Sequence, residues 1–113
     1  MNGTVDVASA NIQWQTLTGG ANVAWDTSLG QLAFLTLTAN NWNIDAPTNL
    51  KRGTYILHLI QSGGAWVVTW DSIFKWPANS APALTGTAGH RDIMSFTCDG
   101  TYLFGTYLPD YYA

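Results

Sequence analysis

The side chains that could act as nucleophiles or general bases are few and stand in no recognisable catalytic motif. They are Ser62, Ser95, Cys98, His58 and His90. A catalytic nucleophile needs a base beside it and a third group that orients the base. Neither a G-x-S-x-G segment nor a cysteine-hydrolase signature surrounds any of them. Cys98 alternates with Met94 and Phe96, which predicts a buried, unreactive thiol.

All seven acidic side chains are Asp, and a glycoside hydrolase would need two carboxylates about 5 to 10 Å apart. Four of the seven fall at predicted turns or strand ends: Asp26, Asp71, Asp99 and Asp110. Asp side chains in such places accept hydrogen bonds from backbone N–H groups, so we interpret these four as structural. His58 shares a strand face with Ile56 and Ile60, which favours a packed or interface histidine over a catalytic base.

Metal and phosphate chemistry have no support in the spacing of residues. The two histidines and the single cysteine are far apart in the sequence and lack the spacing of a metal site. Gly63-Gly64 is followed by neither Lys nor a helical segment, so it does not predict a phosphate-binding loop. We therefore expect a non-enzymatic protein without a metal or cofactor. A small glycan hydrolase is the remaining enzymatic alternative.

Binding chemistry is concentrated in the aromatic residues. The chain has six Trp and five Tyr, and such rings stack on the apolar faces of sugars. Trp42 lies in an Asn-rich turn, Trp66 follows the Gly-Gly turn, and Tyr111-Tyr112 belongs to the C-terminal segment. We interpret these four residues as candidate glycan-binding or subunit-interface residues. Core packing is the alternative for any single Trp.

The charge balance argues against several classes of partner. The chain has four basic and seven acidic residues, a net charge of −3, and a single adjacent basic pair at Lys51-Arg52. Nucleic-acid binding needs clustered Lys and Arg, so no nucleic-acid partner is expected. The apolar stretches are too short to cross a membrane, and the N-terminus shows no signal-peptide pattern. We expect synthesis in a cytoplasm and no membrane insertion.

The composition predicts an all-β fold. Thr and aromatic residues favour pleated, half-buried surfaces, and turn-forming residues recur about every eight to twelve positions. Only 10% of the residues are charged, which is typical of a protein that covers apolar surface by assembly. We predict a single antiparallel β-sandwich, jelly-roll-like, with about eight short strands and an oligomeric state.

Strands and turns can be placed along the chain. The predicted strands include 12–17, 22–25, 31–38, 54–61, 65–70, 92–98 and 101–107. Ser62-Gly63-Gly64 predicts a hairpin between two of these strands, and Asp99-Gly100 predicts a type I′ hairpin turn between the last two. The irregular segment 71–91 is expected to pack over the core through Phe74, Trp76 and Leu84.

An ordered set of short motifs resembles a known family. The motifs in the second half are Gly53-Thr54-Tyr55, Gln61, Thr69-Trp70, Phe74-Lys75-Trp76-Pro77, Ala81-Pro82-Ala83-Leu84, Asp92-Ile93-Met94-Ser95-Phe96 and Asp99-Gly100-Thr101. Those upstream are Val23-Ala24-Trp25-Asp26, Leu35-Thr36-Leu37-Thr38 and Ala46-Pro47-Thr48-Asn49-Leu50. Together they resemble the β-rich C-terminal module of tail-fibre and other surface proteins of tailed bacteriophages and prophages.

The resemblance implies a non-enzymatic component of the virion surface, commonly a trimer, with no catalytic residues to carry over. On this basis the single β-sandwich domain, 1–113, divides into an N-terminal strand or arm at 1–20 and a fibre-type module at 22–107. The chain departs from the family in one respect. A tail fibre has a long shaft before this module, whereas here only about twenty residues precede it.

The favoured function is adhesion to the host surface at a tail-fibre tip. The expected partners are further copies of the chain, as a trimer, together with other virion proteins and a host-surface glycan. Two alternatives stay open. One is a capsid (head) decoration protein that stabilises the capsid, and the other is a stand-alone carbohydrate-binding module.

Overall fold

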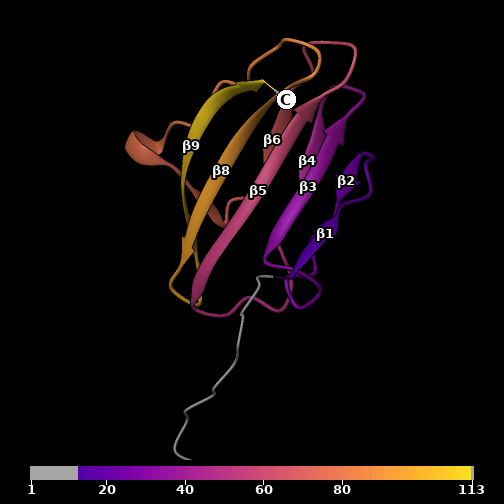
Figure 1. Ribbon diagram of the computed structural model, residues 1–113. Coiled ribbons are helices and arrows are strands. Elements are labelled where there is room, and N and C mark those ends of the chain that lie inside the picture. Colours follow the sequence, from indigo (N-terminus) through magenta and orange to yellow (C-terminus); the bar gives the residue numbers. More distant parts are fainter. Residues whose placement is uncertain (1–12, 113) are drawn as a thin grey trace, which may run out of the picture.

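The computed structural model describes residues 13–112 and folds them into two β-sheets (Figure 1). The larger sheet has the order β1-β3-β5-β8-β9-β7, with β1 (Trp14–Thr16), β3 (Leu32–Leu37), β5 (Gly53–Gln61), β8 (His90–Cys98), β9 (Leu103–Tyr112) and β7 (Phe74–Lys75). The smaller sheet has the order β2-β4-β6, with β2 (Asn22–Val23), β4 (Trp42–Ile44) and β6 (Val68–Trp70).

The predicted all-β class is confirmed for the part of the chain that the structure describes. Apart from the strands, residues 13–112 contain one 3-10 turn (Pro77–Asn79) and no α-helix. Of the expected N-terminal strand or arm at 1–20, residues 1–12 lie outside the described residues, and β1 accounts for part of the rest.

The first six strands alternate between the two sheets. In the larger sheet β1, β3 and β5 pair in parallel, and in the smaller sheet β2, β4 and β6 also pair in parallel. The chain therefore makes three turns of a coil, and each turn adds one strand to each sheet. The prediction of antiparallel pairing is wrong for these strands. The expected jelly-roll connectivity does not match them either, because a jelly roll pairs antiparallel neighbours.

The hairpin predicted at Ser62-Gly63-Gly64 is wrong, because β5 and β6 lie in different sheets. The Gln61 side chain explains how the chain turns this corner without strand pairing. Its Nε2 donates to the backbone carbonyl of Trp66 (2.8 Å), and its Oε1 accepts from the backbone N–H of Trp66 (3.1 Å). One side chain thus satisfies both backbone groups that a hairpin partner would otherwise pair.

The C-terminal part of the larger sheet is antiparallel. β8 pairs with β5 on one side and with β9 on the other, so the predicted last hairpin is confirmed. Its connection is longer than the predicted two-residue type I′ turn, since Cys98 pairs with Leu103. The Asp99 carboxylate stabilises the longer loop by accepting hydrogen bonds from two backbone N–H groups, those of Thr101 and Tyr102, both at 2.8 Å.

The core is a single cluster of buried side chains from both sheets. Val23 and Ile44 of the smaller sheet are fully buried, as are alternate residues of β3 and β5. Phe96 of β8 lies at the centre of an aromatic group whose rings meet edge-on or tilted, formed with Trp25, Trp70, Phe74 and Trp76. The prediction that segment 71–91 packs on the core is confirmed, because Phe74 is buried and Trp76 and Leu84 contact the cluster.

Candidate functional site

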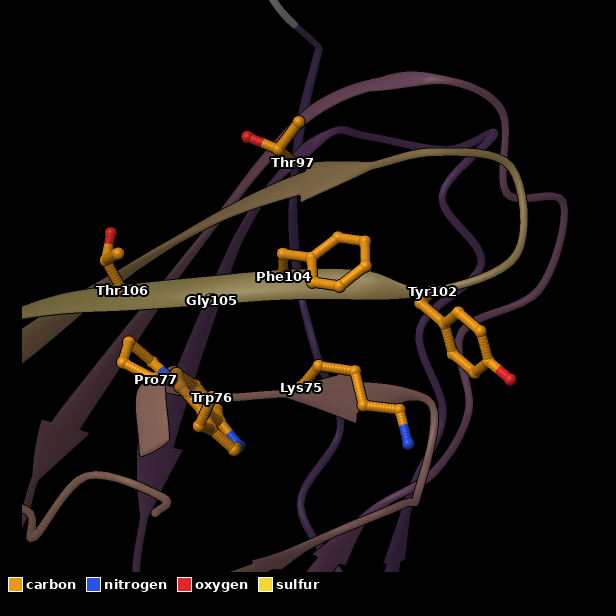
Figure 2. Close-up of a pocket in the computed structure, with 8 residues that line it drawn as sticks. All are labelled: Lys75, Trp76, Pro77, Thr97, Tyr102, Phe104, Gly105 and Thr106. Atoms are coloured by element: carbon orange, nitrogen blue, oxygen red, sulfur yellow. The ribbon is translucent and has the colours of Figure 1, made fainter. Parts of the chain in front are cut away.

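An apolar groove of about 740 Å³ lies where β7 leaves the edge of the larger sheet (Figure 2). Its lining residues come from β7 and the turn that follows it, and from the β8–β9 hairpin. They are Lys75, Trp76, Pro77, Thr97, Tyr102, Phe104, Gly105 and Thr106. Aromatic rings and a proline therefore form most of its surface, with threonine hydroxyls and one ammonium group beside them.

Pro77 explains why the groove forms at this edge of the sheet. β7 pairs with β9 over two positions, Phe74 with Leu103 and Lys75 with Phe104. Pro77 has no N–H to donate to a sheet, and its ring favours an extended residue before it. Trp76 is accordingly extended, with φ −123° and ψ 151°, and a 3-10 turn begins at Pro77. The chain thus leaves β9 at this point, and Trp76 and Pro77 form a wall next to the edge of the sheet.

Glycine at position 105 lets the Trp76 ring approach β9. A Cβ added to Gly105 would lie 2.5 Å from a ring carbon of Trp76 and 2.8 Å from one of Phe96. Trp76 also meets the rings of Trp70 and Phe96, with centroids 5.0 Å and 5.6 Å away. The Trp76 side of the groove is therefore fixed by core packing before any ligand arrives.

The other side of the groove is exposed and aromatic. Tyr102 and Phe104 are 42% and 48% exposed, and their ring centroids lie 6.3 Å apart. Among the described residues that line the groove, Lys75 alone is charged, and its Nζ lies 4.9 Å above the Tyr102 ring. Figure 2 shows these three side chains together along one rim. Such an arrangement suits a ligand with an apolar face, polar edges and room for an anionic group.

Two of the four aromatic residues singled out from the sequence, Trp42 and Trp66, are half-buried and pack against the core. The Trp42 ring lies on Gly19, where an added Cβ would come within 2.2 Å of it. The Trp66 ring covers Gly64 in the same way, and its Nε1 donates to the carbonyl of Ser62 at 2.9 Å. Both rings therefore brace turns of the coil, and neither lines the groove.

The other two, Tyr111 and Tyr112, lie near the end of β9 and are 41% and 84% exposed. The Tyr112 ring meets His90 edge-on, with centroids 4.6 Å apart. The groove belongs to the start of β9, around Phe104. The structure therefore does not bring these tyrosines together with the groove.

Four of the residues considered for catalysis have structural contacts: Cys98, Asp26, Asp71 and Asp99. Cys98 is buried, as expected. Asp26, Asp71 and Asp99 each accept a hydrogen bond from a backbone N–H within three residues, and such bonds contribute to a lowered pKa of Asp99. Asp110 differs, because its carboxylate lies 2.5 Å from Nδ1 of His90. Among residues 13–112, no three His, Cys or Asp side chains cluster as metal ligands would.

His58 lies on the outer face of β5, next to Phe34 and Arg91. Its ring centroid is 4.8 Å from that of Phe34, and its Nδ1 lies 3.3 Å from a guanidinium nitrogen of Arg91. Burial first, and the positive charge of Arg91 second, lower the pKa of His58 below its ordinary value of 6.5. Folding therefore favours the neutral form of the His58 imidazole.

We expect acid to destabilise the protein partly through His58. Unfolded His58 takes up a proton as the pH falls through 6.5, whereas the folded protein resists protonation until its lowered pKa is reached. Urea unfolding at about pH 7.5 and about pH 5.5 should therefore show a lower free energy of unfolding at the acidic value. The decrease should be smaller in His58→Gln. Equal decreases in the two proteins would contradict this role of His58.

Sequence reasoning missed Tyr102 and Phe104 as site residues, although two signals were present. Residues 102–106 alternate Tyr, Leu, Phe, Gly, Thr, which places the two aromatic rings on one strand face. A glycine inside a strand also marks a close approach of another group. What the sequence did not supply was the pairing of β7 with β9, which brings Lys75, Trp76 and Pro77 to that strand.

The chain was compared with protein-family models, curated proteins and solved structures. No family model, curated protein or solved structure matches this chain. The likeness to phage surface modules therefore stays a hypothesis carried by the sequence motifs. None of the described residues forms a helix long and apolar enough to span a membrane.

Proposed function

We propose that this chain is a non-enzymatic surface module of a tailed-phage virion, of the tail-fibre-tip type, that adheres to host-surface glycan. The aromatic groove between β7 and the β8–β9 hairpin carries this proposal. The order of motifs along the chain supports the virion part of it. The groove supports the adhesion part, because it offers a preformed apolar surface with polar groups at its edge.

A saccharide is the ligand class that the groove fits best. Sugar rings have one apolar C–H face and a rim of hydroxyls. The rings of Trp76, Tyr102 and Phe104 provide apolar surface for the face, while Thr97 and Thr106 provide hydroxyls for the rim. Lys75 supplies one positive charge, which would favour a sugar that carries a carboxylate or phosphate group.

Two structural features belong to the proposal as well. The first is a β-sandwich, in which the two sheets enclose the single cluster of buried side chains from both. The second is assembly of several copies on the particle, with a trimer as the expected number. Few residues of the chain are charged, and several large apolar side chains are exposed. This composition supports both the β-sandwich and the assembly of several copies.

The alternatives differ in their need for the groove. A stand-alone carbohydrate-binding module would use the same aromatic surface without a virion. A capsid (head) decoration protein would need no glycan-binding surface, so the exposure of Tyr102 and Phe104 favours adhesion over decoration.

Immunogold labelling of phage particles that carry this chain, with an antibody raised against it, tests the location. Gold at the tail-fibre tips is the expected result. Gold spread over the head would replace adhesion with decoration. No label on any particle, together with glycan binding by the purified chain, would favour the stand-alone carbohydrate-binding module.

A further inference from the structure

A second pocket, of about 440 Å³, adjoins the aromatic groove. Its walls come from β6, from β7 and from the residues that follow each of these strands. Lys75 and Trp76 line both the groove and this pocket, so the two hollows meet along β7. Figure 2 shows both side chains on the β7 side of the groove. We call the second hollow the polar pocket after its polar lining residues, which are Thr69, Asp71, Ser72, Lys75 and Asn79.

The groove and the polar pocket suit different parts of a ligand. Aromatic rings form most of the groove, which favours contact with an apolar face. The polar pocket offers two hydroxyls, one carboxylate and one amide, and such groups donate to and accept from the hydroxyls of a sugar. A ligand that fills both hollows therefore has one unit with an apolar face and a linked unit rich in hydroxyls.

Two of the polar groups are held in place by hydrogen bonds within the protein. The Thr69 hydroxyl donates to Oδ1 of Asn43 (2.7 Å), and Oδ1 of Asp71 accepts from the backbone N–H of Ile73 (3.0 Å). The Thr69 oxygen and the second carboxylate oxygen of Asp71 keep lone pairs that can accept from a ligand. Because these side chains are already ordered, a ligand loses less conformational entropy on binding them.

Asn79 reaches the polar pocket through a strained turn. Ala78 and Asn79 both have left-handed backbones, with φ +54° and +57°. Glycine adopts this conformation freely, whereas the Cβ of alanine makes it costly. Non-glycine residues with such backbones cluster at ligand clamps and other functional sites. The strained turn places the Asn79 side chain in the lining of the polar pocket, which supports a binding role.

The charges of the two hollows set the order of the ligand's units. Nζ of Lys75 lies 4.9 Å from the centroid of the Tyr102 ring, so its positive charge lies on the groove side. The polar pocket contains the Asp71 carboxylate, which repels another anion. An acidic sugar therefore suits the groove, and a neutral sugar suits the polar pocket.

We propose that the polar pocket is a second saccharide subsite. The ligand is then an acidic oligosaccharide of at least two units, with the acidic unit in the groove and a neutral, hydroxyl-rich unit in the polar pocket. This inference rests on the proposed function, because the groove is the first subsite. It adds the length of the ligand and the order of its units.

Binding of the full chain to a glycan array tests the proposal. The array carries monosaccharides, disaccharides and tetrasaccharides in neutral, carboxylated and phosphorylated forms, and isothermal titration calorimetry measures the affinity of those that bind. Disaccharides with one acidic unit should bind at least about tenfold more tightly than the acidic monosaccharide or the neutral disaccharide. The carboxylated and phosphorylated forms show which anion Lys75 prefers.

Asn79→Gly tests the polar pocket, because it removes the amide and keeps a residue that tolerates the left-handed backbone. It should weaken binding of the acidic disaccharide about 5- to 10-fold. Ala78→Gly is the matched control, since it relieves the same strain in the same turn. Within residues 13–112, Ala78 lines neither the groove nor the polar pocket, so this variant should bind like the wild type. Circular dichroism checks that both variants are folded.

The outcomes separate this inference from adhesion itself. Equal affinities for the acidic monosaccharide and disaccharide, equal affinities for the neutral and acidic disaccharides, or wild-type binding by Asn79→Gly would overturn the second subsite. An equal loss in Ala78→Gly would also overturn it. Adhesion in the groove would survive each of these results if Tyr102→Ala still weakened binding. No binding of the wild type to any glycan on the array would contradict the proposed function, and the second subsite with it.

Discussion

Replacing Phe96 with Ala is expected to lower the free energy of unfolding by about 4 kcal/mol. Phe96 is 1% exposed and meets the rings of Trp25, Trp70, Phe74 and Trp76, so its removal leaves a cavity that these large rings cannot fill. In a domain of this size ~1 kcal/mol corresponds to about 4 °C, so the melting temperature should fall by about 15 °C. Urea and thermal unfolding measure the two quantities.

Phe104→Ala is the matched control for this prediction. The same chemical change at a residue that is 48% exposed should alter the free energy of unfolding by less than about 1 kcal/mol. Similar losses in the two variants would contradict the view that Phe96 is the centre of the core and Phe104 a surface residue available to a ligand.

Replacing both Tyr102 and Phe104 with Ala is expected to weaken glycan binding about 30-fold. Each ring should contribute ~1 kcal/mol of stacking, and ~2 kcal/mol corresponds to this factor in the dissociation constant. Because both rings are about half exposed, the variant should stay folded. Isothermal titration calorimetry with a bacterial surface polysaccharide that binds the wild type measures the change.

Tyr112→Ala controls for a general loss of aromatic surface. Tyr112 is 84% exposed and lies at the far end of β9 from the groove, so its removal should leave the dissociation constant unchanged. If Tyr112→Ala weakened binding as much as the double variant, the glycan would lie near the C-terminal tyrosines and not in the groove.

The class of fold could be predicted from the sequence because strand-forming residues and turn residues alternate along it. The predicted segments 31–38 and 54–61 match β3 and β5 to within one residue at each end, because apolar and β-branched residues are concentrated there. The Asp99-Gly100 turn also lies between two long paired strands, β8 and β9. These are local features, and local features are visible in a single sequence.

The pairing of strands could not be predicted in the same way. Ser62-Gly63-Gly64 looks like a hairpin turn, yet the chain crosses there from one sheet to the other. The Gln61 side chain makes this possible by binding the backbone of Trp66. A turn signal reports that the chain changes direction, but which strand lies beside the next one depends on contacts between distant residues.

The candidate site shows the same limit. Aromatic residues near predicted turns, such as Trp42 and Trp66, are natural candidates in a sequence. Trp42 instead begins strand β4, and both rings cover glycines and pack on the core. The groove instead depends on β7 meeting β9, a pairing of two residues that no pattern in the sequence marks. The sequence shows Pro77 and Gly105 as residues with special backbone properties. It does not show that the fold brings them close together.

The most direct test of glycan adhesion is an NMR titration of the full chain with a bacterial surface polysaccharide selected by binding on a glycan array. We expect chemical-shift changes to concentrate at the backbone amides of Lys75, Tyr102, Phe104, Gly105 and Thr106, which line the groove. Changes centred on Tyr111 and Tyr112, or no binding to any polysaccharide on the array, would contradict it.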